Sequence, residues 1–363
     1  MFWQNSPPHD LWHMIAQDAR PKLIYGMGDG ADKLISRLEH LGIPYADVFA
    51  SDEFVRGQTF HGREVFTLKR AEELYGDFVV LVSFATHLPE VISHISAIAK
   101  RHTLYVPDMP AYGDTYFDHA FFTLHKAELA QAQALFSDTR SKEVFSAIVL
   151  GKLTGDLDTL LSCADDPQII FDILGAKDFM CAIDAGAYTG DTVRALLPHA
   201  PHLKHIYAIE PDPHTFRRLS TYAAGETSTE IHLVEGAVWS CETTLSFSGK
   251  GNRGSSAKRQ GKTVEVKTVM LDRLDIPFAV DYVKFDVEGA EYEALLGAKQ
   301  LLLTHRPAVL LSLYHRAEDL YRLPLLLAEL CPDYDFYLRR PPCLPAWEIN
   351  LLAIPKEKRG KTK

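Results

Sequence analysis

The chain has 363 residues and a mass of 40.7 kDa, more than one ordinary domain of roughly 150 residues, so two hydrophobic cores are expected. Its hydrophobic share of 47% and charged share of 24% are those of a folded globular protein, which excludes a disordered or collagen-like chain. Lys and Arg number 38 against 48 Asp and Glu, and the net charge of −10 disfavours a general affinity for nucleic acid or anionic lipid.

No stretch of the sequence is apolar for long enough to span a membrane. The longest apolar runs, such as residues 78–85, fall far short of the roughly 20 residues that a spanning helix requires. No Lys or Arg precedes Arg20, so the N-terminus lacks the basic region of a secretory signal, and we expect a cytoplasmic protein. The five cysteines form no C-x-x-C pair and no Cys/His pair at zinc spacing, which predicts buried thiols.

Residues 1–125 show the alternation of apolar strands and amphipathic helices that is typical of a small α/β domain. The expected strands are residues 22–28, 46–51, 78–84 and 103–106, and the expected helices are residues 31–41, 68–74 and 88–100.

The first strand of this domain leads into Gly26-x-Gly28-x-x-Ala31, which has the spacing of a dinucleotide-binding turn. Asp52 lies about twenty residues further on, at the end of a second strand. Asp29, however, would place a negative charge where a pyrophosphate should sit. We therefore expect a nucleotide-binding shape that serves docking or substrate recognition.

Residues 126–178 have helical spacing without convincing strands, which predicts a helical bridge. Residues 179–355 then form a second α/β domain, and residues 356–363 are expected to be a basic, disordered tail. The expected strands are residues 180–184, 205–210, 231–235, 263–271, 282–286, 308–313, 335–338 and 350–354. The expected helices are residues 189–197, 213–223, 290–303 and 317–330. Seven strands should form a doubly wound sheet, with residues 263–271 pairing locally with residues 244–248.

The strand at residues 180–184 runs directly into Asp184-x-Gly186-x-x-x-Gly190 and then into a helix. Gly186 lets the backbone approach a ligand, Gly190 lets the helix pack near the strand, and free N–H groups at the helix start can meet an anion. Glu210 ends the next strand, where a carboxylate can accept both hydroxyls of a ribose. Because the spacing is not G-x-G-x-x-G and Asp184 can pair with an ammonium, the pattern fits a nucleoside that carries an amino acid.

Three segments occur in order at the ends of predicted strands: residues 183–192 (IDAGAYTGDT), 208–212 (AIEPD) and 284–291 (KFDVEGAE). Together they resemble the FkbM-type S-adenosylmethionine-dependent methyltransferases. The similarity covers about residues 138–355, since residues 141–145, 153–156, 307–320 and 334–339 also resemble a branch of that family. The N-terminal domain lies outside it.

The resemblance implies a Rossmann-like class I methyltransferase domain whose mostly parallel seven-stranded sheet contains an antiparallel seventh strand. It implies S-adenosyl-L-methionine as cofactor, with Asp184, Gly186 and Gly190 at the methionine end and Glu210 at the ribose. The other cofactor residues it implies are Ala187, Thr189, Pro211 and Asp212, Ala237 and Val238 at the adenine, and Asp286 beside the sulfonium. Because family members are best known for methylating hydroxyls of sugars and macrolide-like metabolites, we expect O-methylation of a sugar-like or other small metabolite.

Methyl transfer requires alignment of the two reactants and removal of the acceptor's proton. His315 directly follows a strand and would project over the same crevice as Asp286, and the ordinary pKa of imidazole suits proton removal at neutral pH. His315 is therefore the candidate general base, and Asp286 and Glu288 complete the catalytic set. These three side chains are also compatible with a metal site, but carboxylates are common at helix starts, and we expect no metal.

Residues 248–267 form the one internal basic segment of this acidic chain. They are either a solvated connection or a lid that attracts an anionic acceptor. The expected partner is a small molecule, sugar-like or anionic, with no nucleic acid and no membrane, and a homo-oligomer is compatible with the sequence. Two alternatives stay open: a bifunctional sugar-modifying enzyme that binds NAD in its first domain, and a non-catalytic nucleotide-binding scaffold.

Overall fold

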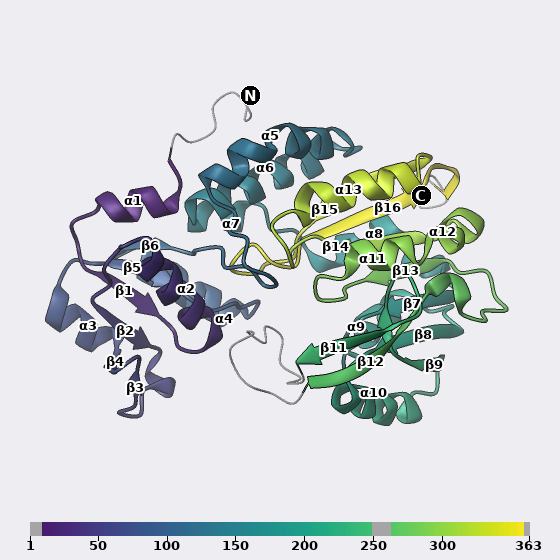
Figure 1. Cartoon of the computed structure of the whole chain (residues 1–363), viewed down its shortest axis with the longest axis horizontal. Helices are drawn as coiled ribbons and strands as arrows, with labels where there is room; N and C mark the ends of the chain where they lie inside the picture. The colour runs from purple at the N-terminus through teal and green to yellow at the C-terminus, as the bar shows by residue number, and fades with distance from the viewer. Residues whose placement is uncertain (1–8, 249–262, 359–363) are drawn as a thin grey trace. The chain divides into compact units, whose positions relative to one another are not determined.

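The computed structural model describes residues 9–248 and 263–358, and contacts divide the chain into two compact units (Figure 1). Unit 1 comprises residues 1–130, 143–165 and 340–348, and unit 2 comprises residues 131–142, 166–339 and 349–363. The expected bridge of residues 126–178 is thus shared between the two units. Within the described residues, no helix is long and apolar enough to cross a membrane.

Unit 1 is built on a six-stranded sheet with the order β3-β4-β2-β1-β5-β6. Its strands are β1 (Lys22–Tyr25), β2 (Asp47–Ala50), β3 (Thr59–Phe60), β4 (Arg63–Thr67), β5 (Val79–Val82) and β6 (Thr103–Tyr105). All neighbours pair in parallel except β3 and β4, a short hairpin that the sequence did not predict. The small parallel sheet that alternation predicts is therefore present.

Unit 1 contains the three helices predicted at residues 31–41, 68–74 and 88–100, one helix of the predicted bridge, and one helix at Leu11–Gln17 that was not predicted. They are α1 (Leu11–Gln17), α2 (Asp29–His40), α3 (Leu68–Tyr75), α4 (Pro89–Ala99) and α7 (Leu157–Ser162). Helices α5 (His119–Ala134) and α6 (Thr139–Thr154) contribute residues to both units. Apolar residues of α1 and α2 pack on β1, β2 and β5 and form the core of this unit.

Unit 2 contains a seven-stranded sheet with the order β15-β16-β14-β13-β7-β8-β9. The strands are β7 (Cys181–Ala185), β8 (His205–Glu210), β9 (Glu230–Glu235), β13 (Tyr282–Phe285), β14 (Ala308–Ser312), β15 (Tyr334–Arg339) and β16 (Asn350–Pro355). β16 alone runs in the direction opposite to the other six strands of this sheet. This confirms the Rossmann-like fold with an antiparallel last strand. All residues of β7, β13, β14 and β16 are buried, whereas the edge strand β9 is partly exposed.

Helices cover both faces of this sheet. They are α8 (Pro167–Leu174), α9 (Asp191–Leu196), α10 (Pro213–Gly225), α11 (Glu291–Leu296), α12 (Lys299–His305) and α13 (Asp319–Leu330). Side chains of α8 and α9 form one core with the strands, and Tyr222 of α10 packs against it. Figure 1 draws α11, α12 and α13 in front of the sheet and α8 behind it.

The single helix predicted over residues 290–303 is wrong, because the chain forms α11 and α12 with a break at Gly297. A Cβ at Gly297 would stand 2.0 Å from the main-chain oxygen of Trp239, so another segment passes against the helix there. The carbonyl of Gly297 accepts from the main-chain N–H of Asp272 at 2.9 Å. The Asp272 carboxylate in turn accepts from the first N–H groups of α12, at Gln300 and Leu301.

A second, three-stranded sheet in unit 2 has the order β10-β12-β11. It consists of β10 (Ala237–Val238), β11 (Thr244–Ser248) and β12 (Thr263–Val269). The antiparallel pairing of β11 with β12 confirms the local pairing predicted for residues 244–248 and 263–271. Most of the basic segment predicted as a connection or lid, residues 249–262, lies outside the described residues, as do residues 359–363 of the expected tail.

All five cysteines are free, as expected. Four of them are buried, but Cys241 is exposed, so the prediction of a buried thiol is wrong at that position. Cys241 lies in the turn that leads into β11, where the main chain runs at the surface.

Candidate active site at the carboxyl ends of the strands

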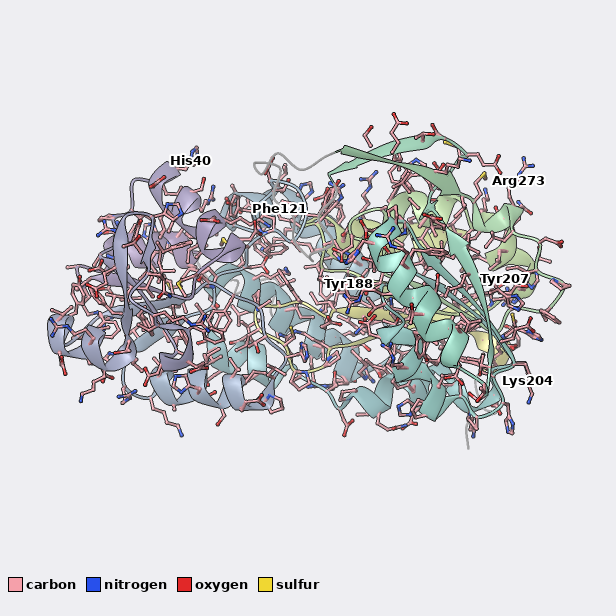
Figure 2. All side chains as sticks on the ribbon, turned by 90° about the horizontal axis from the view of Figure 1, so that it is seen from below. His40, Phe121, Tyr188, Lys204, Tyr207 and Arg273 are labelled. Carbon is pink, nitrogen blue, oxygen red and sulfur yellow. The ribbon has the colours of Figure 1, made fainter. Side chains whose placement is uncertain are left out.

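The predicted site residues of unit 2 follow four neighbouring strands, all at their carboxyl ends. Asp184 lies in β7, Glu210 ends β8, Asp286 follows β13 and His315 follows β14. From β7 the following strands are added toward one edge of the sheet, and from β13 they are added toward the other edge. The boundary between β7 and β13 is therefore the switch point, where doubly wound sheets bind ligands. Figure 2 labels Tyr188 near this end of the strands and Lys204, which precedes β8, at the opposite end.

Glu210 is a buried carboxylate that backbone groups hold in place. One of its oxygens accepts from the main-chain N–H of Tyr188 at 3.0 Å, and the other accepts from that of Asp212 at 2.9 Å. Burial raises the pKa of Glu210 to about 7, although both of these hydrogen bonds oppose the shift. Each oxygen retains a free lone pair, so the carboxylate can accept two further hydroxyl groups.

The turn between β7 and α9 is held by internal hydrogen bonds. The N–H groups of Gly186 and Ala187 both donate to the Ile209 carbonyl, at 3.0 and 2.9 Å, and that of Gly190 donates to the Ala187 carbonyl at 2.8 Å. With the N–H of Tyr188, which donates to Glu210, four N–H groups of the turn have partners within the protein. The sequence had predicted that N–H groups here would be free to bind an anion. The turn positions Glu210 beside β7.

The two predicted glycines of this turn are needed for internal packing. Both have positive φ, and a Cβ at Gly186 would stand 1.8 Å from the main-chain oxygen of Asp286. A Cβ at Gly190 would stand 2.3 Å from the ring of Tyr222, which comes from α10. Gly190 thus allows close packing against α10, whereas the sequence predicted packing of the following helix against the strand. Gly186 allows two strand ends to meet.

Lys284 lies between the two carboxylates of Asp184 and Asp286. Its Nζ is 3.4 Å from Oδ1 of Asp184 and 3.3 Å from Oδ2 of Asp286. Burial alone would lower the pKa of Lys284, but the negative charges of Asp286 and Asp184 outweigh that effect and raise it. The other Asp184 oxygen accepts from the hydroxyl of Thr192. Lys284 is a functional candidate that the motifs did not single out, although a lysine inside the buried strand β13 is itself an unusual feature.

His315 lies completely buried among three carboxylates. Its Nδ1 is 2.9 Å from Oε1 of Glu291, and its Nε2 is 3.5 Å from Asp286 and 3.6 Å from Glu288. Burial would lower the pKa of His315, but the three charges, with Glu291 first, raise it to about 10. The imidazole is therefore a cation at neutral pH.

The acidic cluster divides into buried and accessible members. The side chains of His315 and Glu291 are 1% and 0% exposed, whereas those of Asp286 and Glu288 are 21% and 58% exposed. Glu291 also accepts from the main-chain N–H of Val287 at 2.8 Å, which fixes the loop after β13. Among these four residues, solvent therefore reaches mainly Asp286 and Glu288.

Donor atoms of Asp286, Glu291 and His315 lie within 4.8 Å of one another, a spacing that could hold a metal ion. The ring of His315 bridges the carboxylates, with Nδ1 facing Glu291 and Nε2 facing Asp286. Lys284 supplies a second cation next to Asp286. The acidic cluster thus has two basic side chains, His315 and Lys284, beside its carboxylates.

The remaining predicted cofactor residues lie around the same edge. The carboxylate of Asp212 accepts from Thr215 N–H at 2.8 Å and caps α10, so its oxygen already serves the helix. Ala237 and Val238 form the buried strand β10. The carbonyl of Thr189 accepts from Arg194 at 3.2 Å, and Pro211 lies between Glu210 and the α10 cap.

In unit 1, the turn of Gly26, Gly28 and Ala31 connects β1 to α2 as predicted. A Cβ at the intervening Gly30 would stand 2.0 Å from the main-chain oxygen of Ser83, so the chain packs closely against the end of β5 there. The carboxylate of Asp29 lies 3.1 Å from Lys33, one turn along α2. Asp29 therefore has a partner within its own helix.

Residues 184–338, which contain all of the strand-end residues above, match the sequence profile of the methyltransferase FkbM domain. The chain contains an FkbM methyltransferase domain. None of the curated proteins matches the sequence.

Among solved structures, the chain is similar to a methyltransferase FkbM from Methylobacillus flagellatus KT, with 20% identity and a TM-score of 0.70 over 95% of this chain and 93% of that chain. It also aligns with precorrin-6y C5,15-methyltransferase from Geobacter metallireducens GS-15 (14% identity, TM-score 0.32, 51% and 84% covered). A third alignment is with an rRNA methylase from Streptococcus thermophilus (12% identity, TM-score 0.34, 52% and 95% covered). The first likeness shows a shared fold that includes unit 1 as well as the FkbM domain.

Proposed function

We propose that the chain transfers a methyl group from S-adenosyl-L-methionine to a hydroxyl oxygen of a sugar-like or other small metabolite. The observation that carries this proposal is the set of polar groups at the switch point of the FkbM domain: Asp184 in β7, Glu210 in β8 on one side of it, and Lys284 and Asp286 at β13 on the other side. A nucleoside and an amino acid joined by a sulfonium need an anchor at each end. When bound, the cofactor supplies an electrophilic methyl group.

Glu210 is suited to hold the ribose of the cofactor. Its two oxygens are fixed by the N–H groups of Tyr188 and Asp212, so the lone pairs that remain have a defined direction. Burial strengthens hydrogen bonds from ribose hydroxyls to this carboxylate, because few water molecules compete there.

Asp184 is suited to the ammonium of the methionine end. It lies beside the turn that begins at Gly186, and its oxygen Oδ1 is buried without a hydrogen bond, next to Lys284. An ammonium group could donate to that oxygen. This is a contact that the resemblance implied and that the position of Asp184 supports.

Asp286 is the group that we assign to the acceptor hydroxyl. As the carboxylate follows β13 and is partly exposed, it can accept the hydroxyl proton while the oxygen forms its new bond to the methyl carbon. Glu288 is the most exposed member of the cluster and has a φ of 53°, a strained value for a side chain of its kind. We assign Glu288 to binding a second polar group of the acceptor.

His315, which the sequence predicted as the base, has a different role in this proposal. It is buried, and its cationic ring has no lone pair to accept a proton. It stands 3.5 Å from Asp286, whose neighbours also include Lys284 and the hydroxyl of Tyr314 at 3.3 Å. His315 therefore acts as a positioning residue that holds Asp286 in place.

The first test measures cofactor binding alone, because it requires no knowledge of the acceptor. Isothermal titration of the full chain with S-adenosylmethionine and S-adenosylhomocysteine should show micromolar binding. Asp184→Asn and Glu210→Gln should each weaken it by at least about tenfold, which corresponds to roughly 1.4 kcal/mol. The control is Asp333→Asn, which changes an exposed acid before β15 at the far end of the sheet.

Absence of binding by the wild-type chain, or equal binding by all three variants, would contradict the proposed cofactor site. Once binding is established, hydroxylated metabolites and nucleotide-linked sugars can be screened as acceptors by the formation of S-adenosylhomocysteine. Asp286→Asn should abolish turnover and leave cofactor affinity within a few fold of the wild type.

A further inference from the structure

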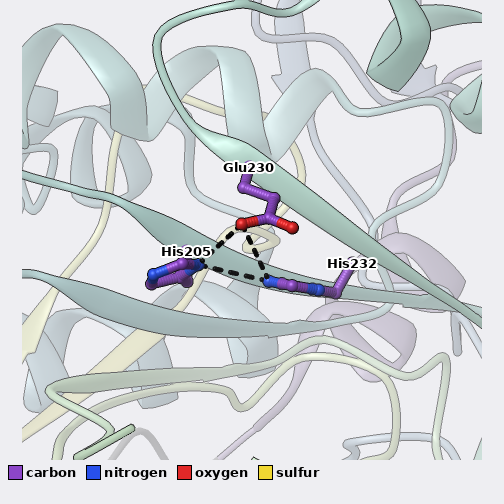
Figure 3. Close-up of side chains that lie close together, drawn as sticks. All are labelled: His205, Glu230 and His232. Carbon is purple, nitrogen blue, oxygen red and sulfur yellow. Dashed lines mark hydrogen bonds and ion pairs between the residues drawn. The ribbon is translucent and has the colours of Figure 1, made fainter.

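Two histidines and a glutamate converge at the end of the unit 2 sheet opposite to the active site (Figure 3). His205 is the first residue of β8, Glu230 is the first of the edge strand β9, and His232 is two residues further along β9. The active-site residues lie at the carboxyl ends of the strands, so this cluster does not belong to that site.

The strand register explains why these side chains meet. His205 pairs directly with Glu230, and Tyr207 pairs with His232. Because residues two apart on a strand share a face, all four side chains lie on the same side of the sheet. The two histidines are diagonal neighbours, and Glu230 stands directly opposite one of them.

The three facing atoms are spaced like the ligands of one small cation. Nδ1 of His205 is 3.3 Å from Nε2 of His232, and Oε2 of Glu230 is 3.2 Å and 3.9 Å from these two nitrogens. Tetrahedral zinc has bonds of about 2.0–2.2 Å to histidine and carboxylate, so its ligand atoms stand roughly 3.3–3.5 Å apart. The observed distances approach that geometry without any movement of the main chain.

Aromatic contacts hold both imidazole rings in place. The ring of Phe278 stacks on His205 with centroids 3.8 Å apart, and the ring of Tyr207 stacks on His232 with centroids 4.4 Å apart. The interplanar angles are 10° and 16°. Fixed rings reduce the entropy that ion binding would cost, because the donor nitrogens already point toward the same place.

The cluster is also open to solvent. The side chains of His205, His232 and Glu230 are 22%, 28% and 64% exposed, so an ion can enter and a water molecule can complete its coordination. Two imidazoles and one carboxylate form a donor set that suits zinc, whereas magnesium prefers oxygen ligands alone.

We propose that His205, Glu230 and His232 form a zinc site with one open coordination position. The ion would join the edge strand β9 to β8, so its expected effect is on the stability of unit 2. The sequence alone does not indicate this site, because at least 25 residues separate His205 from the other two ligands, and they meet only through the pairing of β8 with β9.

The test is metal binding by the whole chain after treatment with a chelator. Cobalt(II), a spectroscopic substitute for zinc, should bind one ion per chain and give the visible absorption of a tetrahedral site, and zinc should displace it. Zinc should also raise the melting temperature of the wild-type chain by a few degrees, since it binds the folded state. Magnesium should do neither.

His232→Ala and Glu230→Gln should each weaken zinc binding by at least about tenfold and remove the thermal shift. Glu230 is mostly exposed, so its variant should fold normally and keep the test valid if His232→Ala does not. The control is His40→Ala, which removes an exposed histidine of α2 and should bind zinc like the wild type. If the wild type binds no zinc, or if Glu230→Gln binds zinc as tightly as the wild type, the proposal is wrong.

Discussion

The α-carbon of Gly186 faces the main-chain oxygen of Asp286 so closely that a Cβ would stand 1.8 Å from it. The turn after β7 and the acidic loop after β13 are therefore in direct main-chain contact. The main-chain N–H of Asp286 donates to the Ala185 carbonyl at 3.0 Å and strengthens the same junction. The proposed cofactor turn and the proposed acceptor-binding loop cannot move independently.

Gly186→Ala should destabilise the protein and weaken cofactor binding together. The new methyl group would meet a carbonyl oxygen, and the φ of 90° disfavours any side chain. We therefore expect the free energy of unfolding to fall by about 2–4 kcal/mol. Thermal denaturation and titration with S-adenosylmethionine measure the two effects. The control is Gly225→Ala at the end of α10, where a Cβ meets nothing within 4 Å. Equal behaviour of the two variants would contradict the contact.

Lys284→Met should be among the most destabilising single changes in the FkbM domain. The ammonium lies within 3.4 Å of both Asp184 and Asp286, and its removal leaves two neighbouring carboxylates without a cation. Removing one partner of a buried ion pair lowers the free energy of unfolding by about 3–5 kcal/mol. Chemical denaturation measures the loss, and the double variant Lys284→Met with Asp184→Asn should recover part of it. No recovery would mean that Lys284 contributes through packing alone.

The fold of unit 2 could be predicted from the sequence, because its strands are short apolar runs separated by helices. The prediction for β8 matches the observed bounds, and the other strands of the main sheet differ by one residue at most ends. The break in the helix at Gly297 could not be predicted from the sequence, because it depends on contacts with Trp239 and Asp272, which come from distant parts of the chain. The β3–β4 hairpin was missed because its strands are short and polar.

The candidate site could be predicted from the sequence only in part. The sequence placed Asp184, Glu210, Asp286 and His315 at the ends of neighbouring strands, where the structure has them, because parallel strands bring their carboxyl ends to one edge. The raised pKa of His315 could not be predicted, because it depends on the buried carboxylate of Glu291. From the sequence alone, the position of Glu291 at a helix start was enough to explain an acidic residue there. Lys284 lies within the segment at residues 284–291, but its contacts with Asp184 and Asp286 appear only in the structure.

His315 and Glu291 should behave as one charged pair. His315→Gln leaves the fully buried Glu291 carboxylate without its nearest cation, so we expect a loss of about 3 kcal/mol or more at pH 7. Adding Glu291→Gln should restore a large part of that loss, because both members of the pair are then neutral. A double-mutant cycle of unfolding free energies measures the coupling. Additive losses in the cycle would contradict the ion pair.

The same pair predicts how stability depends on pH. The pKa of His315 is raised from 6.5 to about 10 in the folded chain, so its stabilising contribution is complete below pH 6.5 and is lost as the pH rises through 10. The unfolding free energy of the wild type should therefore fall between these values. His315→Gln should show a shallower fall, while His40→Gln, at an exposed histidine, should follow the wild type.

Glu210 should make cofactor affinity depend on pH near neutrality. Its pKa in the unliganded chain is raised to about 7 by burial, so a large fraction of the carboxyl group is protonated below that pH. Hydroxyl groups that donate to it favour the ionised form, so cofactor affinity should rise with pH up to about 7 and level off above it.

Binding near pH 6.5 should release a proton from Glu210, because the bound cofactor lowers the pKa of the carboxyl group. Isothermal titration in buffers of different ionisation enthalpy measures that release directly. Glu210→Gln should bind more weakly, with no proton release from this position and with a flatter dependence on pH. If the wild type and Glu210→Gln depended on pH in the same way, the ribose contact would have to come from another residue.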